Sequence, residues 1–166
     1  MTAALLTELV DRHGAALVLY ARQWCATPED VAQAAFLKLA RADVPPERVG
    51  TWLFRVARNG AIDAGRADRR RRKHEAHAAG RTPCWFAPPD DPAGLDAQAA
   101  AEALQTLPLE VREVLVAHLW GGLTFGQIAA AAGGSASSAH RRYCAGIEAL
   151  RECLRVPGLP NPPTRS

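Results

Sequence analysis

Residues 123–150, LTFGQIAAAAGGSASSAHRRYCAGIEAL, predict two helices joined by a tight glycine turn. Thr124 is placed to cap the first helix, and Gln127 stands at the capping-box position three residues later. Gly133 and the glycine after it end this helix, because glycine readily adopts the left-handed backbone that such turns need. Ser135 is placed to cap a second and longer helix.

The same stretch meets the steric needs of a helix-turn-helix. Ala129 is small where the two helices touch, Gly133 lies in the turn, and Ala139 is an apolar anchor early in the second helix. In this motif the second helix enters the major groove of duplex DNA. The side chains expected on its outer face are Ser137, Ser138, His140, Arg141 and Cys144. The alternative interpretation is an ordinary helical hairpin with a solvated polar face.

Helical periodicity continues on both sides of this motif, and no segment requires a strand. Thr27 is placed to cap one of the earlier helices, with Pro28 at the first helical position. The further helices are expected over residues 3–24, 28–41, 51–73, 96–107 and 108–120.

A proline-rich segment separates the two halves of the chain. Residues 80–94 contain four prolines and two glycines, which are typical of an irregular linker. Trp85 and Phe86 within it are unusual for a passive linker. We therefore predict an all-α protein of two small helical domains, the second containing the helix-turn-helix. The expected bounds are 1–76 and 96–155 for the domains, 77–95 for the linker and 156–166 for a flexible tail.

Positive charge is concentrated in the first half. The formal net charge is only +3, yet residues 55–73 contain eight Lys or Arg residues against two Asp. Such a concentration indicates a polyanionic partner, although a solvated helix end is the alternative. The polar and basic side chains along this helix are Arg55, Arg58, Asn59, Arg66, Arg69, Arg70, Arg71, Arg72 and Lys73. Arginine and asparagine can also contact base edges.

The expected compartment is the cytoplasm, with no membrane insertion. No run of eighteen apolar residues occurs, and Glu8 and Asp11 interrupt the stretch where a signal peptide would be apolar. The four cysteines (Cys25, Cys84, Cys144 and Cys153) form no CxxC pair, so free thiols are expected.

The chemistry of an enzyme is not expected, nor is a cofactor, a metal or a small-molecule substrate. We find no Ser/His/Asp set, paired catalytic carboxylates or phosphate-binding glycine loop. His74, His77 and Cys84 could hold a metal in principle, but no fourth ligand has the spacing of a metal site.

The order of these parts resembles the extracytoplasmic-function class of bacterial RNA polymerase sigma factors. Residues 29–36, EDVAQAAF, look like the helix that binds core polymerase. Residues 52–66, WLFRVARNGAIDAGR, look like the segment that melts and reads the −10 element, and this match is the most specific. Residues 107–115 and 122–129 resemble the domain that binds the −35 element.

This resemblance implies roles for particular residues. Asp30, Gln33 and Phe36 would bind the clamp of core RNA polymerase, with an exposed Phe36 as an anchor. The alternative is that Phe36 is simply part of the core. Arg58, Asn59 and Arg66, together with the loop 43–50, would engage single-stranded −10 DNA. Arg141 and Arg142 would contact the −35 duplex, and an anti-sigma factor is a further implied partner. Trp52 is expected to be core.

The second domain departs from the family pattern, with Gly126, Ala139 and Ala145 where other residues are usual. Its arginines and glutamates balance between residues 99 and 155, so weak duplex binding by this domain alone is expected. Two rival functions remain open at this point. One is a helix-turn-helix regulator that never binds polymerase, which leaves the 29–36 and 52–66 matches unexplained. The other is a sigma-like adaptor or decoy that binds polymerase or an inhibitor without initiating transcription.

Overall fold

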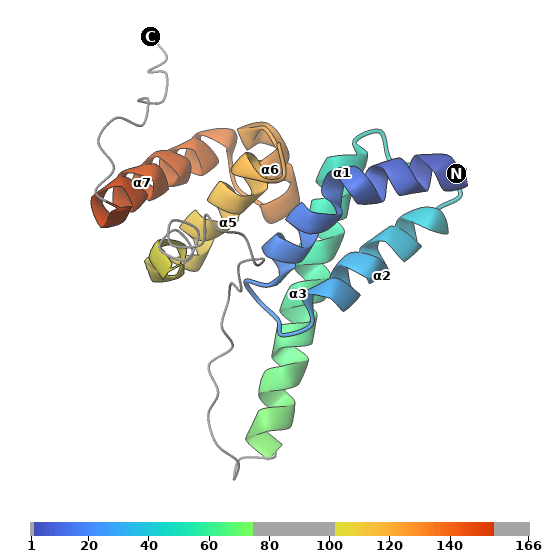
Figure 1. The fold of residues 1–166 in the computed structure, drawn as a ribbon, viewed down its shortest axis with the longest axis horizontal. Coiled ribbons are helices and arrows are strands. Elements are labelled where there is room, and N and C mark those ends of the chain that lie inside the picture. Colours follow the sequence, from blue (N-terminus) through green and yellow to red (C-terminus); the bar gives the residue numbers. More distant parts are fainter. Residues whose placement is uncertain (1, 75–101, 155–166) are drawn as a thin grey trace, which may run out of the picture.

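The regular structure of the chain is entirely α-helical in the part that the structure describes. A computed structural model describes residues 2–74 and 102–154. A short helical stretch over 102–106 precedes α5, and Figure 1 shows the order of the helices along the chain. The helices are α1 (Ala3–Ala21), α2 (Pro28–Ala40), α3 (Val49–His74), α5 (Leu109–Leu119), α6 (Phe125–Ala132) and α7 (Ala136–Leu154). The all-helical prediction is confirmed.

Helix termini follow the local signals with one exception. Thr124 and Gln127 form the predicted capping box, and the Oγ of Ser135 accepts a hydrogen bond from the backbone N–H of Ser138 at 3.1 Å. Thr27 is the N-cap residue of α2 as predicted, but its side chain makes no capping hydrogen bond. That start instead has Pro28, whose fixed φ suits the first helical position, followed by two acidic residues that favour the helix dipole.

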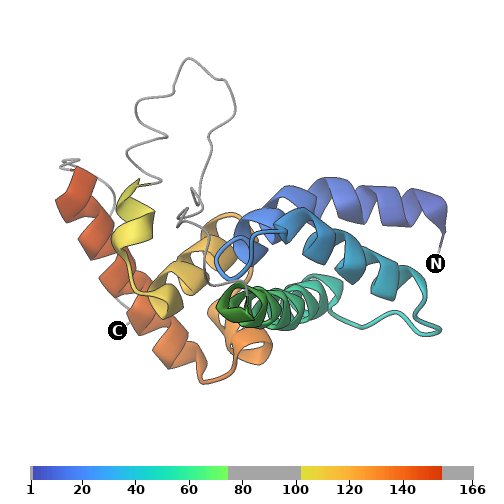
Figure 2. The ribbon, with the colours of Figure 1, turned by 90° about the horizontal axis from the view of Figure 1, so that it is seen from below.

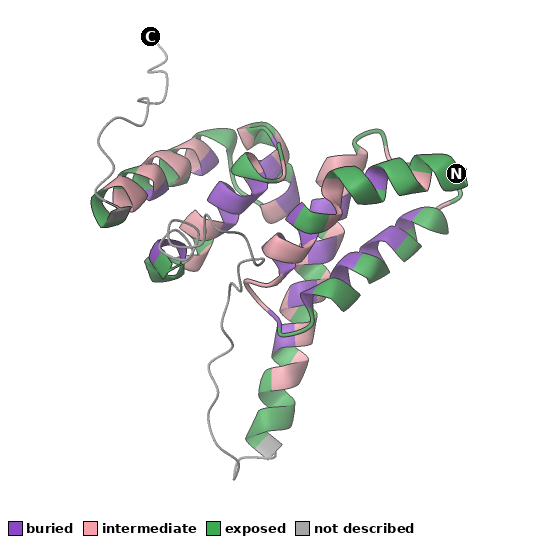
Figure 3. Ribbon diagram, viewed as in Figure 1, coloured by how far each residue is buried: buried purple, intermediate pink, exposed green. Residues whose placement is uncertain are grey.

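Helices α1, α2 and α3 pack together as one group, with a core of small and branched side chains. Leu17, Ala35, Leu39 and Ala57 are buried between them. A Cβ on Gly65 would lie 2.2 Å from the carbonyl oxygen of Trp24, so only glycine permits this approach. The C-terminal half of α3 continues beyond the packed body and is largely exposed (Figures 1 and 3).

Helices α5, α6 and α7 form the second group, in which α7 packs on both of the others. Gly133 has φ +89°, which confirms the predicted positive-φ turn between α6 and α7. Ala139 is buried, as expected for the apolar anchor early in the second helix of the predicted helix-turn-helix. His118 joins the three helices, because its ring stacks on Phe125 at 4.6 Å and meets Tyr143 edge-on at 4.9 Å between ring centroids.

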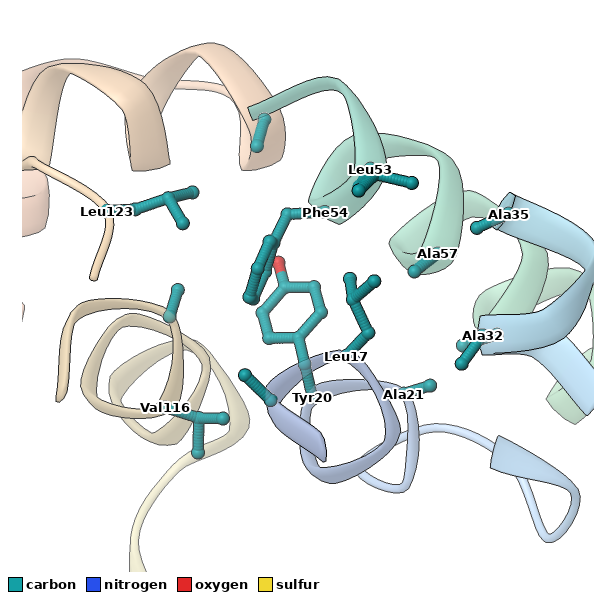
Figure 4. Packing of buried hydrophobic residues seen from close by; sticks show 14 of the residues in the cluster. Leu17, Tyr20, Ala21, Ala32, Ala35, Leu53, Phe54, Ala57, Val116 and Leu123 are labelled. Carbon is teal, nitrogen blue, oxygen red and sulfur yellow. The ribbon is translucent and has the colours of Figure 1, made fainter. Parts of the chain in front are cut away.

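The two groups share one continuous core. Helix α1 contacts α5, and α3 contacts α6. Figure 4 shows Phe54 of the first group beside Tyr20 and facing Leu123 of the second group, and Figure 2 shows the groups side by side from below. The domain bounds remain a prediction, and the predicted linker, the tail, Trp85 and Phe86 lie outside the described residues.

Candidate nucleic-acid and polymerase interfaces

The C-terminal half of α3 presents a basic ridge, defined here as Arg66 and residues 69–73. All of its side chains are exposed. Two acids lie beside it: Asp63 is 3.7 Å from Arg66, and Asp68 is 2.8 Å from Arg71. Exposed pairs of this kind contribute little energy and leave most of the positive field intact. The ridge can therefore follow a phosphate backbone without first breaking strong internal contacts.

The N-terminal half of α3 extends this surface. Arg55 and Asn59 are exposed, as a role in DNA contact requires. Trp52 is half-buried and packs against the core. The loop before α3 lies near the same end of the helix, and its Val44 is 81% exposed.

Arg58 differs from the other predicted DNA contacts, because the second group holds it. Its side chain is 26% exposed, and its Nε donates a hydrogen bond to Oε1 of Glu113 at 2.5 Å. The guanidinium also lies over the ring of Trp24, 5.8 Å from the ring centroid. Partial burial alone would lower the pKa of Arg58, but the hydrogen bond and charge of Glu113 outweigh it and raise this pKa.

The same carboxylate oxygen accepts a second hydrogen bond. The hydroxyl of Tyr20 donates to Oε1 of Glu113 at 2.6 Å. Burial first, and then the charge of Glu113 and this hydrogen bond, raise the pKa of Tyr20 well above its ordinary value. Among the described residues Glu113 is the one charged side chain that is buried, at 5% exposure.

Sequence reasoning did not single out Glu113. Its two partners lie 93 and 55 positions away along the chain, so no local pattern reveals the contact. A weaker signal was available, since Glu113 directly precedes the apolar run Val114, Leu115, Val116 and Ala117. An acid within the buried part of a helix needs partners.

The recognition helix α7 presents a smaller charged surface. Ser137, Arg141 and Arg142 are exposed, and Ser138 and His140 are half-buried. The ring of His140 packs edge-on against Phe125, with 5.1 Å between centroids. Its Nε2 also lies 3.6 Å from Sγ of Cys144. The outermost positions of the predicted face are therefore Ser137 and the two arginines.

Helix α2 has an outer face that differs from the predicted one at a single position. Asp30 and Gln33 are exposed as expected. The prediction of an exposed Phe36 is wrong: this ring is 8% exposed and belongs to the core. It shares the buried stripe of Ala32, Ala35 and Leu39, which faces α1 and α3. Leu37, one turn after Gln33, is 48% exposed and is the apolar residue on that face. Asp30, Gln33 and Leu37 are called the α2 outer face below.

No candidate metal centre emerges from the described residues, which contain no group of three or more potential ligands. His77 and Cys84 lie outside them. None of the helices described here has the length and apolar character that crossing a membrane requires.

A protruding basic helix and a helix-turn-helix on one helical body are together typical of a DNA-binding protein. The family model of sigma-70 region 2 matches residues 9–72. The chain is 34% identical to the ECF RNA polymerase sigma factor SigL of Mycobacterium tuberculosis, over 95% of this chain and 93% of SigL. It is 35% identical to the RNA polymerase sigma factor CarQ of Myxococcus xanthus, over 78% of this chain and 75% of CarQ.

Solved structures extend the similarity to the fold of both helix groups. The sigma factor RpoE in complex with the anti-sigma factor NepR from Bartonella quintana matches with a TM-score of 0.73 and 21% identity. That match covers 95% of this chain and all of RpoE. CnrH, solved in complex with the cytosolic domain of CnrY, matches with a TM-score of 0.63 and 26% identity over 95% of this chain and 92% of CnrH.

The chain belongs to the extracytoplasmic-function RNA polymerase sigma factors. It is a sigma factor that directs RNA polymerase, in common with the relatives SigL and CarQ, which are RNA polymerase sigma factors. A plain helix-turn-helix regulator is not favoured, because the similarity to SigL extends through the first half as well.

Proposed function

We propose that three separate surfaces divide the work of initiation among them. The first domain, about residues 1–76, binds core polymerase through the α2 outer face and the −10 element through α3. The second, about residues 96–155, binds the −35 element through α7. The observation that carries this proposal is the basic ridge, which is exposed and continuous with Arg55 and Asn59.

Core polymerase binds the α2 outer face in this proposal. Asp30 and Gln33 supply polar contacts, and Leu37 supplies the apolar anchor that interfaces commonly have. Phe36 supports this face from below by holding α2 against α1 and α3.

The −10 element binds along α3. Arg55, Arg58, Asn59, Arg66, Arg69 and Arg70 supply cations and hydrogen-bond donors on one helix. The positive ridge tracks phosphates, and the exposed loop 43–50 offers Val44 to a displaced base. Capture of an unstacked base offsets part of the free energy of opening the duplex.

The −35 element binds at α7 through Ser137, Arg141 and Arg142. Ser138 and His140 lie at the edge of this surface, where both are half-buried and the ring of His140 packs against Phe125. Helix α7 contains three arginines against two glutamates, so its charge alone gives little affinity. Polymerase therefore has to position this domain on the duplex.

The expected compartment, cofactors and further partners follow from the same function. The chain acts in the cytoplasm, where polymerase and DNA are, and needs no cofactor or small-molecule substrate. An anti-sigma factor is a further partner, and the fold shared with RpoE, which was solved bound to NepR, supports this.

Run-off transcription on a genomic-fragment library tests the proposal. Purified core polymerase is assayed with and without this protein, and discrete start sites that require the protein are expected. Polymerase binding without new start sites would favour the adaptor or decoy. Failure to bind polymerase would contradict the assignment of the α2 outer face.

A further inference from the structure

The contact between the two helix groups contains a buried polar centre. Tyr20 of α1 and Arg58 of α3 both donate to one oxygen of Glu113, which belongs to α5. Three helices from the two groups therefore meet at a single carboxylate. Burial of a carboxylate is unfavourable unless it is paired and hydrogen-bonded, so the closed contact can bury Glu113 only because Tyr20 and Arg58 satisfy its carboxylate.

Apolar packing around this centre closes the same contact. Phe54 is fully buried, and its ring reaches the second group at Gly121. A Cβ on Gly121 would lie 2.5 Å from Cζ of Phe54 and 2.5 Å from the carbonyl oxygen of Ala117. The absence of a side chain at residue 121 thus makes room for the ring. Figure 4 shows Leu123 of the second group facing Phe54.

The closed arrangement occupies one of the proposed DNA contacts. Arg55, Asn59 and Arg66 remain exposed, whereas Arg58 is held by Glu113 and covers Trp24. Arg58 cannot present its whole guanidinium to a phosphate or a base until it leaves Glu113. Closure and full use of the −10 surface therefore compete for the same side chain.

We propose that Glu113 is an intramolecular latch, which holds the two helix groups closed in the free chain and withholds Arg58 from DNA. The latch opens when core polymerase positions the two groups apart on the promoter. The role of Arg58 in this inference depends on the proposed function, but the closure itself does not.

The primary test measures the shape of the full-length free protein by small-angle X-ray scattering. Glu113→Gln keeps the size of the side chain but removes the charge that pairs with Arg58. Glu110→Gln is the matched control, because Glu110 lies one turn away on α5, is exposed, and undergoes the same charge change. We expect the maximum dimension of Glu113→Gln to exceed that of the wild type. We expect the maximum dimension of Glu110→Gln to equal that of the wild type.

Gly121→Ala opens the contact from its apolar side and does not alter charge. It serves as the second variant if Glu113→Gln loses helicity in circular dichroism. An expanded particle with intact helicity is again expected. Equal dimensions for both variants and the wild type would overturn the latch, as would a wild-type chain that is already extended.

The DNA test uses a short fluorescein-labelled single strand of mixed sequence and fluorescence anisotropy. If about one chain in ten is open in the wild type, freeing Arg58 tightens binding by about tenfold. One further phosphate contact also steepens the log–log salt dependence by about 0.7. Glu110→Gln controls for the added net charge. An expanded Glu113→Gln variant with the DNA affinity of Glu110→Gln would keep closure but overturn the withholding of Arg58 and its proposed DNA role.

Discussion

The two helices proposed to contact DNA differ in where their charge lies and in what supports them. Helix α3 contains eight basic residues against two acidic ones, and its C-terminal half leaves the packed body. Helix α7 contains three basic residues against two acidic ones and rests on α5 and α6. The first surface can attract DNA by charge alone, whereas the second depends on being placed correctly. We therefore expect α3 to supply most of the affinity for DNA, and α7 to contribute only when the second group is correctly positioned on the duplex.

The largest effect is expected from the basic ridge. Replacing Arg69, Arg70, Arg71 and Arg72 by glutamine removes up to four phosphate contacts, each contributing about 0.9 to the salt slope on duplex DNA. We expect affinity at ~0.1 M salt to fall by about three orders of magnitude, measured by anisotropy across a salt series.

The control for this variant replaces four basic residues outside α3, α7 and the loop 43–50. Three are exposed, Arg12, Lys38 and Arg41, and the fourth is Arg22, whose side chain is 27% exposed. The net charge changes equally, but the expected loss is small. An equal loss in both variants would show that binding follows total charge, and the distinction between α3 and α7 would fail.

A second comparison separates the core of the first group from its polymerase face. Phe36→Ala removes a buried ring and is expected to lower the free energy of unfolding by about 3–4 kcal/mol in urea titrations. Leu37→Ala removes an exposed side chain and is expected to change it by less than about 0.5 kcal/mol.

For correctly folded protein, we expect Leu37→Ala to reduce retention on immobilised core polymerase more than Phe36→Ala does. Leu37→Ala weakens retention, since Leu37 is the apolar residue of the α2 outer face. The opposite result would assign the apolar contact with polymerase to Phe36. In that case Leu37→Ala would be retained like the wild type, and folded Phe36→Ala would not be retained.

Glycine-to-alanine substitutions, one in each helix group, measure how tightly the two groups are packed. A Cβ at Gly65 would meet the backbone oxygen of Trp24 at 2.2 Å, and one at Gly146 would meet Val111 and Leu115 side chains at 2.7 and 2.8 Å. Backbone yields less than side chains do, so Gly65→Ala is expected to destabilise by about 3 kcal/mol and Gly146→Ala by about 1 kcal/mol. Thermal and urea unfolding measure both, and the reverse order would mean that α7 is the more tightly fitted helix.

Local sequence patterns predicted much of the fold. The spacing of residues in the family motif predicted less of the candidate site. The capping box at Thr124, the turn at Gly133 and the buried Ala139 depend on neighbouring residues, which a sequence shows directly. For Phe36 the spacing of the family motif suggested an exposed anchor, while the apolar periodicity also allowed burial, and the structure places the ring in the core. The partners of Glu113 are brought together only by tertiary packing, and no periodicity encodes that contact.

The smallest expected effect has the opposite sign and concerns Gly126 in the first turn of α6. A Cβ there would meet nothing closer than the Oγ1 of Thr124 at 4.0 Å. Gly126→Ala should therefore stabilise the protein by about 0.5–1 kcal/mol in urea unfolding, because alanine is the better helix former. If duplex affinity for the −35 element stays unchanged, the glycine is a departure without a binding role. If affinity falls while stability rises, the missing side chain leaves room for the DNA backbone, and this helix-turn-helix is fitted to its duplex by shape where α3 is fitted by charge.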